Sequence, residues 1–291
     1  MGIAIANPIY DTVFKFLMED LDIAREFIGE IIHEEILSIQ VRPQESTASV
    51  ERTERKTKPE ENISFFTVYR LDFLAEIRTK EGPKKVLIEL QKAKLSSDIM
   101  RFRRYLGSQY QKDHYPIIAI YILGHHFDPS LPKVIEVSHI LKDRLHNRPV
   151  EVKKNEFIES LNHDSFIIQL HGLPTEMQTR LERILSIFDA AALKIKEHIM
   201  VYDEPMSDEL QKKIAARLNY AASDETVKRQ MDLEEEVLME MQDLERKIEE
   251  KEKTIQKITE EKDKTIEEKD KTIEEKDRII EELKQQLKKT I

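Results

Sequence analysis

The chain has 291 residues, of which 40% are hydrophobic and 36% are charged, and its formal net charge is −10. It has no cysteine, which excludes disulfides and any zinc or iron–sulfur site with cysteine ligands. The N-terminus lacks a basic segment followed by an apolar run, and no window approaches the roughly 18 apolar residues of a membrane helix. We therefore expect a cytoplasmic protein that does not enter a membrane.

The negative charge is unevenly distributed along the chain. Residues 232–291 include 21 acidic and 14 basic side chains, whereas residues 84–115 include eight basic and three acidic ones. A local basic patch can bind phosphate even when the whole chain is acidic. Nucleic acid is therefore retained as a partner.

The first part of the chain, residues 1–170, predicts an α/β domain. Apolar residues at helical spacing predict a helix over residues 11–32, and a first strand is expected at 36–41. The polar segment 42–62 is expected to be an exposed loop.

Two β-rich runs follow, at residues 63–79 and 84–93, joined by Lys-Glu-Gly-Pro. Because Gly82 and Pro83 favour a turn, the two runs should form a hairpin. Residues 96–114 predict a helix capped by Ser96 or Ser97. The continuous apolar run at 115–124 predicts a strand that is buried on both faces.

The remainder of the chain predicts helices. Residues 171–222 form a helical extension in this interpretation, with one helix beginning at a capping box of Thr175 and Gln178 and another after Ser207. Residues 223–291 contain the repeated sequence Lys-Asp-Lys-Thr-Ile-Glu-Glu, which has a period of seven.

A single heptad register fits this last segment from Val227 onward. Apolar residues such as Met231 and Ile266 occupy a positions, whereas Glu234 and three successive lysines occupy d positions. A coiled coil that joins copies of the chain is the favoured interpretation. A single charged helix supported by Glu–Lys pairs four residues apart is the alternative.

The polar side chains of the second hairpin strand are the candidate site. Strand alternation puts Leu87, Glu89 and Gln91 on one face, and the hairpin brings Asp72 of the preceding strand towards Glu89. Two carboxylates that lie close together repel each other unless something neutralises them. Oxygen ligands suit Mg²⁺ or Mn²⁺, and either ion would polarise a phosphodiester and activate a water.

These residues resemble a known pattern. Asp72 followed by Glu89-Leu90-Gln91 is similar to the Asp…Glu-x-Lys signature of the PD-(D/E)xK nuclease superfamily. The segments Asn-Pro-Ile-Tyr-Asp-Thr-Val-Phe-Lys, which includes Asp11, and the Arg- and Tyr-rich run that starts at Arg101 resemble its transposase-associated branch, the recombination-promoting nucleases. The resemblance covers roughly the first half of the chain.

The resemblance implies a restriction-endonuclease-like core, a central mixed sheet flanked by helices, and a Mg²⁺-dependent DNA endonuclease, with RNA not excluded as a substrate. It implies that Asp72 and Glu89 bind the metal and that Asp11 completes the acidic cluster or orients a ligand. Gln91 stands where a lysine is usual; it can still orient a water or bind a phosphate oxygen.

The basic residues that follow are expected to bind nucleic acid: Lys92, Lys94, Arg101 and Arg104. Lys92 and Lys94 should point to the face opposite Glu89, so Arg101 or Arg104 is the better candidate to balance transition-state charge.

Simpler interpretations stay open. Asp72 and Glu89 could be strand acids paired with basic neighbours, Asp11 could be a helix N-terminal acid, and the arginines could form a solvated face. The chain could then be a catalytically inactive binding or assembly protein, or a nuclease effector of a toxin or phage-defence system.

Overall fold

The computed structural model describes residues 2–42, 73–92, 98–112, 114–125, 127–150, 158, 161–173, 177–189, 194–196 and 198–290. Asp72, Lys94, Ser96 and Ser97 lie outside these residues, as does most of the loop expected at 42–62. The described chain divides into two compact units, one that ends at Glu236 and one that begins at Val237.

The first unit is built on a mixed six-stranded sheet with the order β2-β3-β4-β5-β9-β6. The strands are β2 (Ile36–Val41), β3 (Phe73–Thr79), β4 (Gly82–Gln91), β5 (Ile117–Leu123), β9 (His163–Gln169) and β6 (Val134–Val137). Strands β4, β5 and β9 run parallel, and the other neighbours pair antiparallel. This confirms the α/β class and the central mixed sheet.

The β3–β4 hairpin follows the sequence pattern. Its turn uses Gly82 at a φ of 128°, which a residue with a side chain rarely adopts. Phe73 pairs with Ile88 and Thr79 pairs with Gly82. The register therefore brings the first described residue of β3 beside the residue that precedes Glu89.

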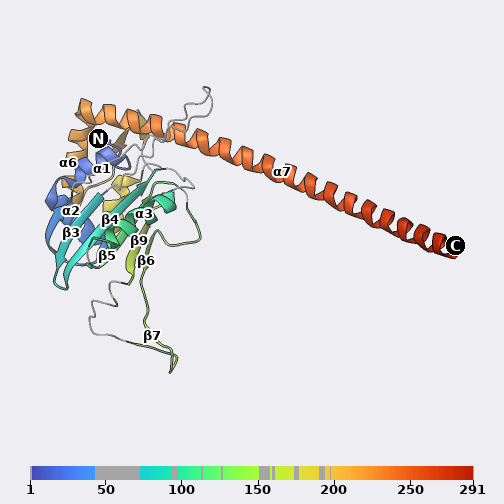
Figure 1. The fold of residues 1–291 in the computed structure, drawn as a ribbon. Coiled ribbons are helices and arrows are strands. Elements are labelled where there is room, and N and C mark those ends of the chain that lie inside the picture. The colour runs from blue at the N-terminus through green and yellow to red at the C-terminus, as the bar shows by residue number, and fades with distance from the viewer. Residues whose placement is uncertain are drawn as a thin grey trace. The chain divides into compact units, whose positions relative to one another are not determined.

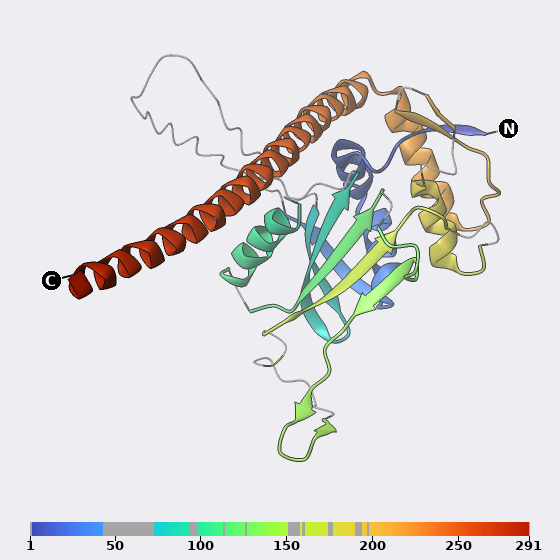
Figure 2. The same ribbon diagram turned by 90° about the vertical axis from the view of Figure 1, so that its right-hand side faces the viewer.

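Helices cover both faces of the sheet, as the two views show (Figures 1 and 2). Helices α1 (Asp11–Met18) and α2 (Leu21–Ile32) pack on the larger apolar core, which includes Val86, Ile88 and Leu90 of β4. Helix α3 (Asp98–Tyr110) packs on the other face, through a smaller cluster that contains Leu87 and Phe102.

The prediction of one helix over residues 11–32 was wrong in one respect. The first helix ends at Met18 and a second begins at Leu21. Asp20 caps the second helix, α2, by accepting hydrogen bonds from the backbone nitrogens of Asp22 and Ile23. An aspartate that can satisfy the exposed N–H groups of a new helix favours such a restart. The break lets both short helices lie against the sheet.

The prediction of one long helix that begins at Thr175 and Gln178 was also wrong, although Thr175 itself lies outside the described residues. The structure has a short helix α5 (Arg180–Leu185), capped by Thr179 and Glu182, and a 3-10 turn at Ser186–Phe188. The following strands β10 (Lys194–Lys196) and β11 (Ile199–Tyr202) form a small sheet with β1 (Ile3–Ala6). The apolar spacing was helical in part, but pairing with β1 overrides it.

Two further elements complete the first unit. Helix α6 (Glu209–Ser223) is capped by Asp208 and packs against β1, α1 and α2. A short ribbon of β7 (Lys142–Asp143) and β8 (Arg148–Pro149) extends from the end of β6 (Figure 1).

Helix α7 (Glu225–Thr290) belongs to both units. Its first turns insert Val227 and Met231 into the larger core, where Met231 is fully buried. Beyond Glu236 the helix forms the second unit by itself, with many of its apolar side chains exposed. None of the described helices is apolar over a length that would cross a membrane.

Candidate active site at the carboxyl end of strand β4

Glu89 is the buried acid of β4. It is fully shielded from solvent and alternates with Ile88 and Leu90, so it shares the α3 face with Leu87. Its partner on β5 is Tyr121, and the Phe102 ring of α3 packs on Tyr121 with the ring centroids 4.5 Å apart. The arrangement places a carboxylate beneath α3, as the alternation predicts.

The charge of Glu89 influences its neighbour. Burial raises the pKa of the Tyr121 hydroxyl, and the nearby Glu89 carboxylate raises it further. An ionised carboxylate disfavours a second negative charge close by. Tyr121 therefore stays protonated to a higher pH than a free tyrosine does.

Gln91 ends β4 at a point where three segments meet. Its carbonyl oxygen accepts hydrogen bonds from the Gly124 backbone nitrogen at 2.9 Å and from His125 Nδ1 at 3.3 Å. A Cβ on Gly124 would lie 2.8 Å from Ile9 Cγ1. Glycine is therefore needed for the segment that leads into α1 to approach the ends of β4 and β5.

Lys92 leaves the sheet on the side opposite Glu89, as the alternation predicts. Its Nζ lies 3.7 Å from the centroid of the Tyr10 ring and forms an ion pair with the Glu235 carboxylate. Burial lowers the pKa of Lys92 to about 8, and the charge of Glu234 opposes this shift. Lys92 is thus a partly desolvated cation at the carboxyl end of β4.

Asp11 is the first residue of α1 and lies in the same group of polar residues as Lys92. Its Oδ2 forms an ion pair with Lys15 at 2.6 Å, and its backbone nitrogen donates to Glu234 at 2.9 Å. Within the described ranges, no three Asp, Glu or His side chains are grouped so that they could hold a metal ion. A pairing of Asp72 with Glu89 falls outside those ranges.

The predicted nucleic-acid contacts are described only in part. Lys94 lies outside the described residues, and of Arg101 only the backbone position in α3 is described. Arg103 and Arg104 are exposed on α3, while Phe102 and Leu106 of the same helix are buried. The outer side of α3 is therefore basic and faces solvent.

Sequence reasoning missed the acids that α7 brings to this region. Glu234 accepts hydrogen bonds from the backbone nitrogens of Asp11 and Thr12, at 2.9 and 2.8 Å, and from the Thr12 hydroxyl. Glu235 accepts a hydrogen bond from the Tyr10 hydroxyl at 2.7 Å. The sequence offered one indication of this contact, because Glu234 is a charged residue at a d position of the heptad register, where an apolar residue is expected.

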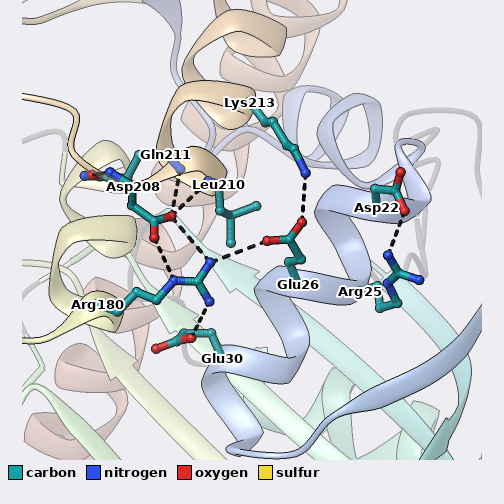
Figure 3. A network of polar contacts seen from close by, with 9 residues as sticks. All are labelled: Asp22, Arg25, Glu26, Glu30, Arg180, Asp208, Leu210, Gln211 and Lys213. Carbon is teal, nitrogen blue, oxygen red and sulfur yellow. Dashed lines mark hydrogen bonds and ion pairs between the residues drawn. The ribbon is translucent and has the colours of Figure 1, made fainter.

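A second polar cluster has a structural role (Figure 3). The Arg180 guanidinium contacts Asp208 at 2.8 Å, Glu30 at 2.8 Å and Glu26 at 3.4 Å, and Glu26 also pairs with Lys213 at 2.8 Å. The contacts with Asp208 and Glu30 raise the pKa of Arg180. Together the ion pairs join α5 and α6 to α2. The cluster fixes the helical layer behind the sheet.

No protein-family model, curated protein or solved structure matches this chain.

Proposed function

We propose that the protein is a metal-dependent endonuclease that hydrolyses DNA phosphodiester bonds, with Asp72 and Glu89 as the metal-binding pair. The observation that carries this proposal is the fully buried carboxylate of Glu89 on the β4 strand of a mixed sheet. Acidic side chains are seldom fully buried, and buried ionisable groups are frequent at functional sites. Metal binding is the role proposed for Glu89.

The register of the hairpin supports the choice of Asp72. Phe73 pairs with Ile88, and in the sequence Asp72 precedes Phe73 while Glu89 follows Ile88. Leu74 and Leu87 share the α3-side cluster. In the proposed site, the alternation that places Leu74 on this face also applies to Asp72, two residues earlier.

Carboxylate oxygens are donors that Mg²⁺ and Mn²⁺ prefer, so Glu89 and Asp72 fit such an ion. A bound ion would polarise the phosphodiester and lower the pKa of a bound water. In this proposal Gln91 orients the water. Arg101 and Arg104 of α3, with Lys92 and Lys94, hold the phosphate backbone.

The test is cleavage of supercoiled plasmid DNA in Mg²⁺, in Mn²⁺ and in EDTA. We expect nicking by the full chain in either metal and none in EDTA. Glu89→Gln and Asp72→Asn should each lower the rate by at least about 100-fold, because each removes a charged metal ligand. Glu136→Gln is the matched control, since it removes an exposed acid of β6.

Equal cutting by wild type and both site variants would show that the site is assigned incorrectly. A labelled RNA assayed in parallel distinguishes the two kinds of nucleic acid. Cleavage of the RNA alone would show that the substrate is RNA and not DNA.

A second candidate is a binding or assembly protein that uses the same fold without catalysis. The exposed apolar side chains of the second unit favour it, because they recur along one long helix. Absence of metal binding by calorimetry, with self-association intact, would support this candidate. In either case we propose that this helix joins copies of the chain as a coiled coil.

A further inference from the structure

Glu234 and Glu235 lie where α7 meets Lys92 and the N-terminus of α1. Met231 and Val227 anchor the first turns of α7 in the core, with Met231 fully buried. The next turn brings Glu234 to the N-terminus of α1 and Glu235 to Lys92. Both acids are half-buried.

The contacts of these two acids are those that a bound anion would make. Two backbone N–H groups and the Thr12 hydroxyl donate to Glu234, while the Tyr10 hydroxyl and the Lys92 ammonium donate to Glu235. Exposed N–H groups at a helix N-terminus attract negative charge. The carboxylates of α7 thus occupy donors that would otherwise face solvent.

The same contact contains a repulsive component. Burial raises the pKa of Glu234, and the neighbouring Asp11 carboxylate raises it further, while the hydrogen bonds from Thr12 lower it. Part of the attraction is therefore offset by desolvation and by like charge. A contact balanced in this way is suited to being displaced.

We propose that Glu234 and Glu235 form an autoinhibitory contact that covers Lys92 and the start of α1 against the phosphate backbone of nucleic acid. This inference rests on the proposed function for the class of ligand. Five charged side chains take part in these contacts: Lys15 and Lys92 are cationic, and Asp11, Glu234 and Glu235 are anionic. Their formal sum is −1 with α7 in place and +1 when the two acids are withdrawn.

His198 and Asp232 extend the contact on one side. His198 Nδ1 lies 2.5 Å from the Tyr10 hydroxyl, and its Nε2 lies 3.1 Å from Asp232 Oδ1. Asp232 is the third acid of α7 in this region, and it binds the turn before β11 rather than the cationic surface. It therefore holds the helix in place and does not cover Lys92.

The test compares the binding of a fluorescent DNA duplex by four full-length proteins, wild type and three variants, in EDTA at pH 7, so that cleavage does not interfere. Glu234→Gln with Glu235→Gln removes the two covering charges, and glutamine can still accept the backbone hydrogen bonds. Glu236→Gln with Glu240→Gln removes the same charge from exposed positions of the same helix. Melting temperatures check that each variant is folded.

We expect the first variant to bind DNA about tenfold more tightly than wild type, because the closed state no longer competes. The control should change affinity by less than about twofold, as expected when exposed, screened charges are removed. Adding Lys92→Ala to the first variant should abolish its gain. The salt dependence of the first variant should steepen by about one unit, as expected for one more phosphate contact.

Equal changes in both double variants, or no tighter binding in the first, would overturn the autoinhibitory contact. The nuclease proposal is tested separately, by measuring plasmid nicking in Mg²⁺ with the same proteins. Tighter binding without nicking would leave the contact standing and remove the nuclease. Nicking with unchanged binding would support the nuclease and overturn the autoinhibitory contact.

Discussion

At the scale of single residues, the end of β4 carries two different kinds of polar side chain, Glu89 and, three residues later, Lys92. Glu89 faces α3 and is fully buried, whereas Lys92 reaches the α1 side and lies over Tyr10. The two side chains lie on opposite sides because successive side chains of a strand point to opposite faces, and the two positions are an odd number of residues apart. The proposed metal site and the proposed phosphate contact are therefore built on different faces of one strand end.

The depressed pKa of Lys92 leads to a prediction about stability. Burial lowers the pKa to about 8 in the folded chain, whereas an unfolded lysine titrates near 10.4. Between these values the unfolded chain binds more protons, so this residue makes folding more favourable as pH rises. The difference in unfolding free energy between wild type and Lys92→Met should therefore grow in favour of wild type from about pH 8 to pH 10.

Urea unfolding of both proteins at pH 7, 8, 9 and 10 measures that difference. The Lys92→Met protein serves as the reference that cancels all other titrating groups. A difference that shrinks with rising pH would mean that the ion pair with Glu235 outweighs desolvation. In that case the folded pKa would lie above the unfolded one.

At the scale of elements, α7 changes its role along its length. Its first turns carry buried apolar residues, but beyond Glu236 the apolar side chains are exposed, including Ile255 at 63% and Ile266 at 55%. Leu244 and Ile258 are exposed apolar residues that the single predicted heptad register leaves outside its a and d positions. If the helix forms a coiled coil, a change of register along it would place both sets of apolar residues in the seam.

This exposure predicts self-association through the second half of α7. Ile266 and Ile273 are seven residues apart, and each is 55% exposed in the single chain. Replacing both with glutamine should convert the proposed oligomer into a monomer, because the a positions supply most of the apolar contact in a coiled coil. Light scattering coupled to gel filtration measures the mass directly.

Glu268→Gln with Lys271→Gln is the control for that experiment. It replaces two exposed residues of the same helical stretch with the same amino acid. This control should keep the mass of wild type. A wild-type chain that is monomeric at all concentrations would instead favour the isolated charged helix.

At the scale of the whole molecule, the compact first unit includes the start of α7. Val227 and Met231 are part of the larger core, and the unit ends at Glu236. A chain that stops after Glu236 should therefore unfold at nearly the temperature of the full chain. One that stops after Asp224 loses both core side chains and should be less stable by several kcal/mol, on the order of 2–5 per large side chain removed.

Thermal unfolding followed by circular dichroism compares the two truncated chains with the full chain. Met231→Ala in the full chain provides a milder version of the same change. Met239→Ala is its matched control, because Met239 is 58% exposed on the same helix. Equal melting temperatures for the two truncated chains would show that the first turns of α7 do not support the core.

Much of the fold follows from local pattern. Continuous apolar runs and the Gly-Pro turn predict β4, β5 and the hairpin between them, because these features act within a few residues. The break between α1 and α2 and the strands β10 and β11 were not predicted. An aspartate cap decides the first, and pairing with β1, nearly 200 residues away in the chain, decides the second.

The sequence by itself determined which face of β4 carries Glu89 and Gln91, and that Lys92 points away from them, because strand alternation is a local rule. Only the tertiary structure decided what Lys92 meets. Glu235, which forms an ion pair with Lys92, and its neighbour Glu234, which binds the start of α1, lie more than 140 residues further along the chain. No periodicity specifies such a contact, since it depends on where the buried Met231 anchors α7 in the core.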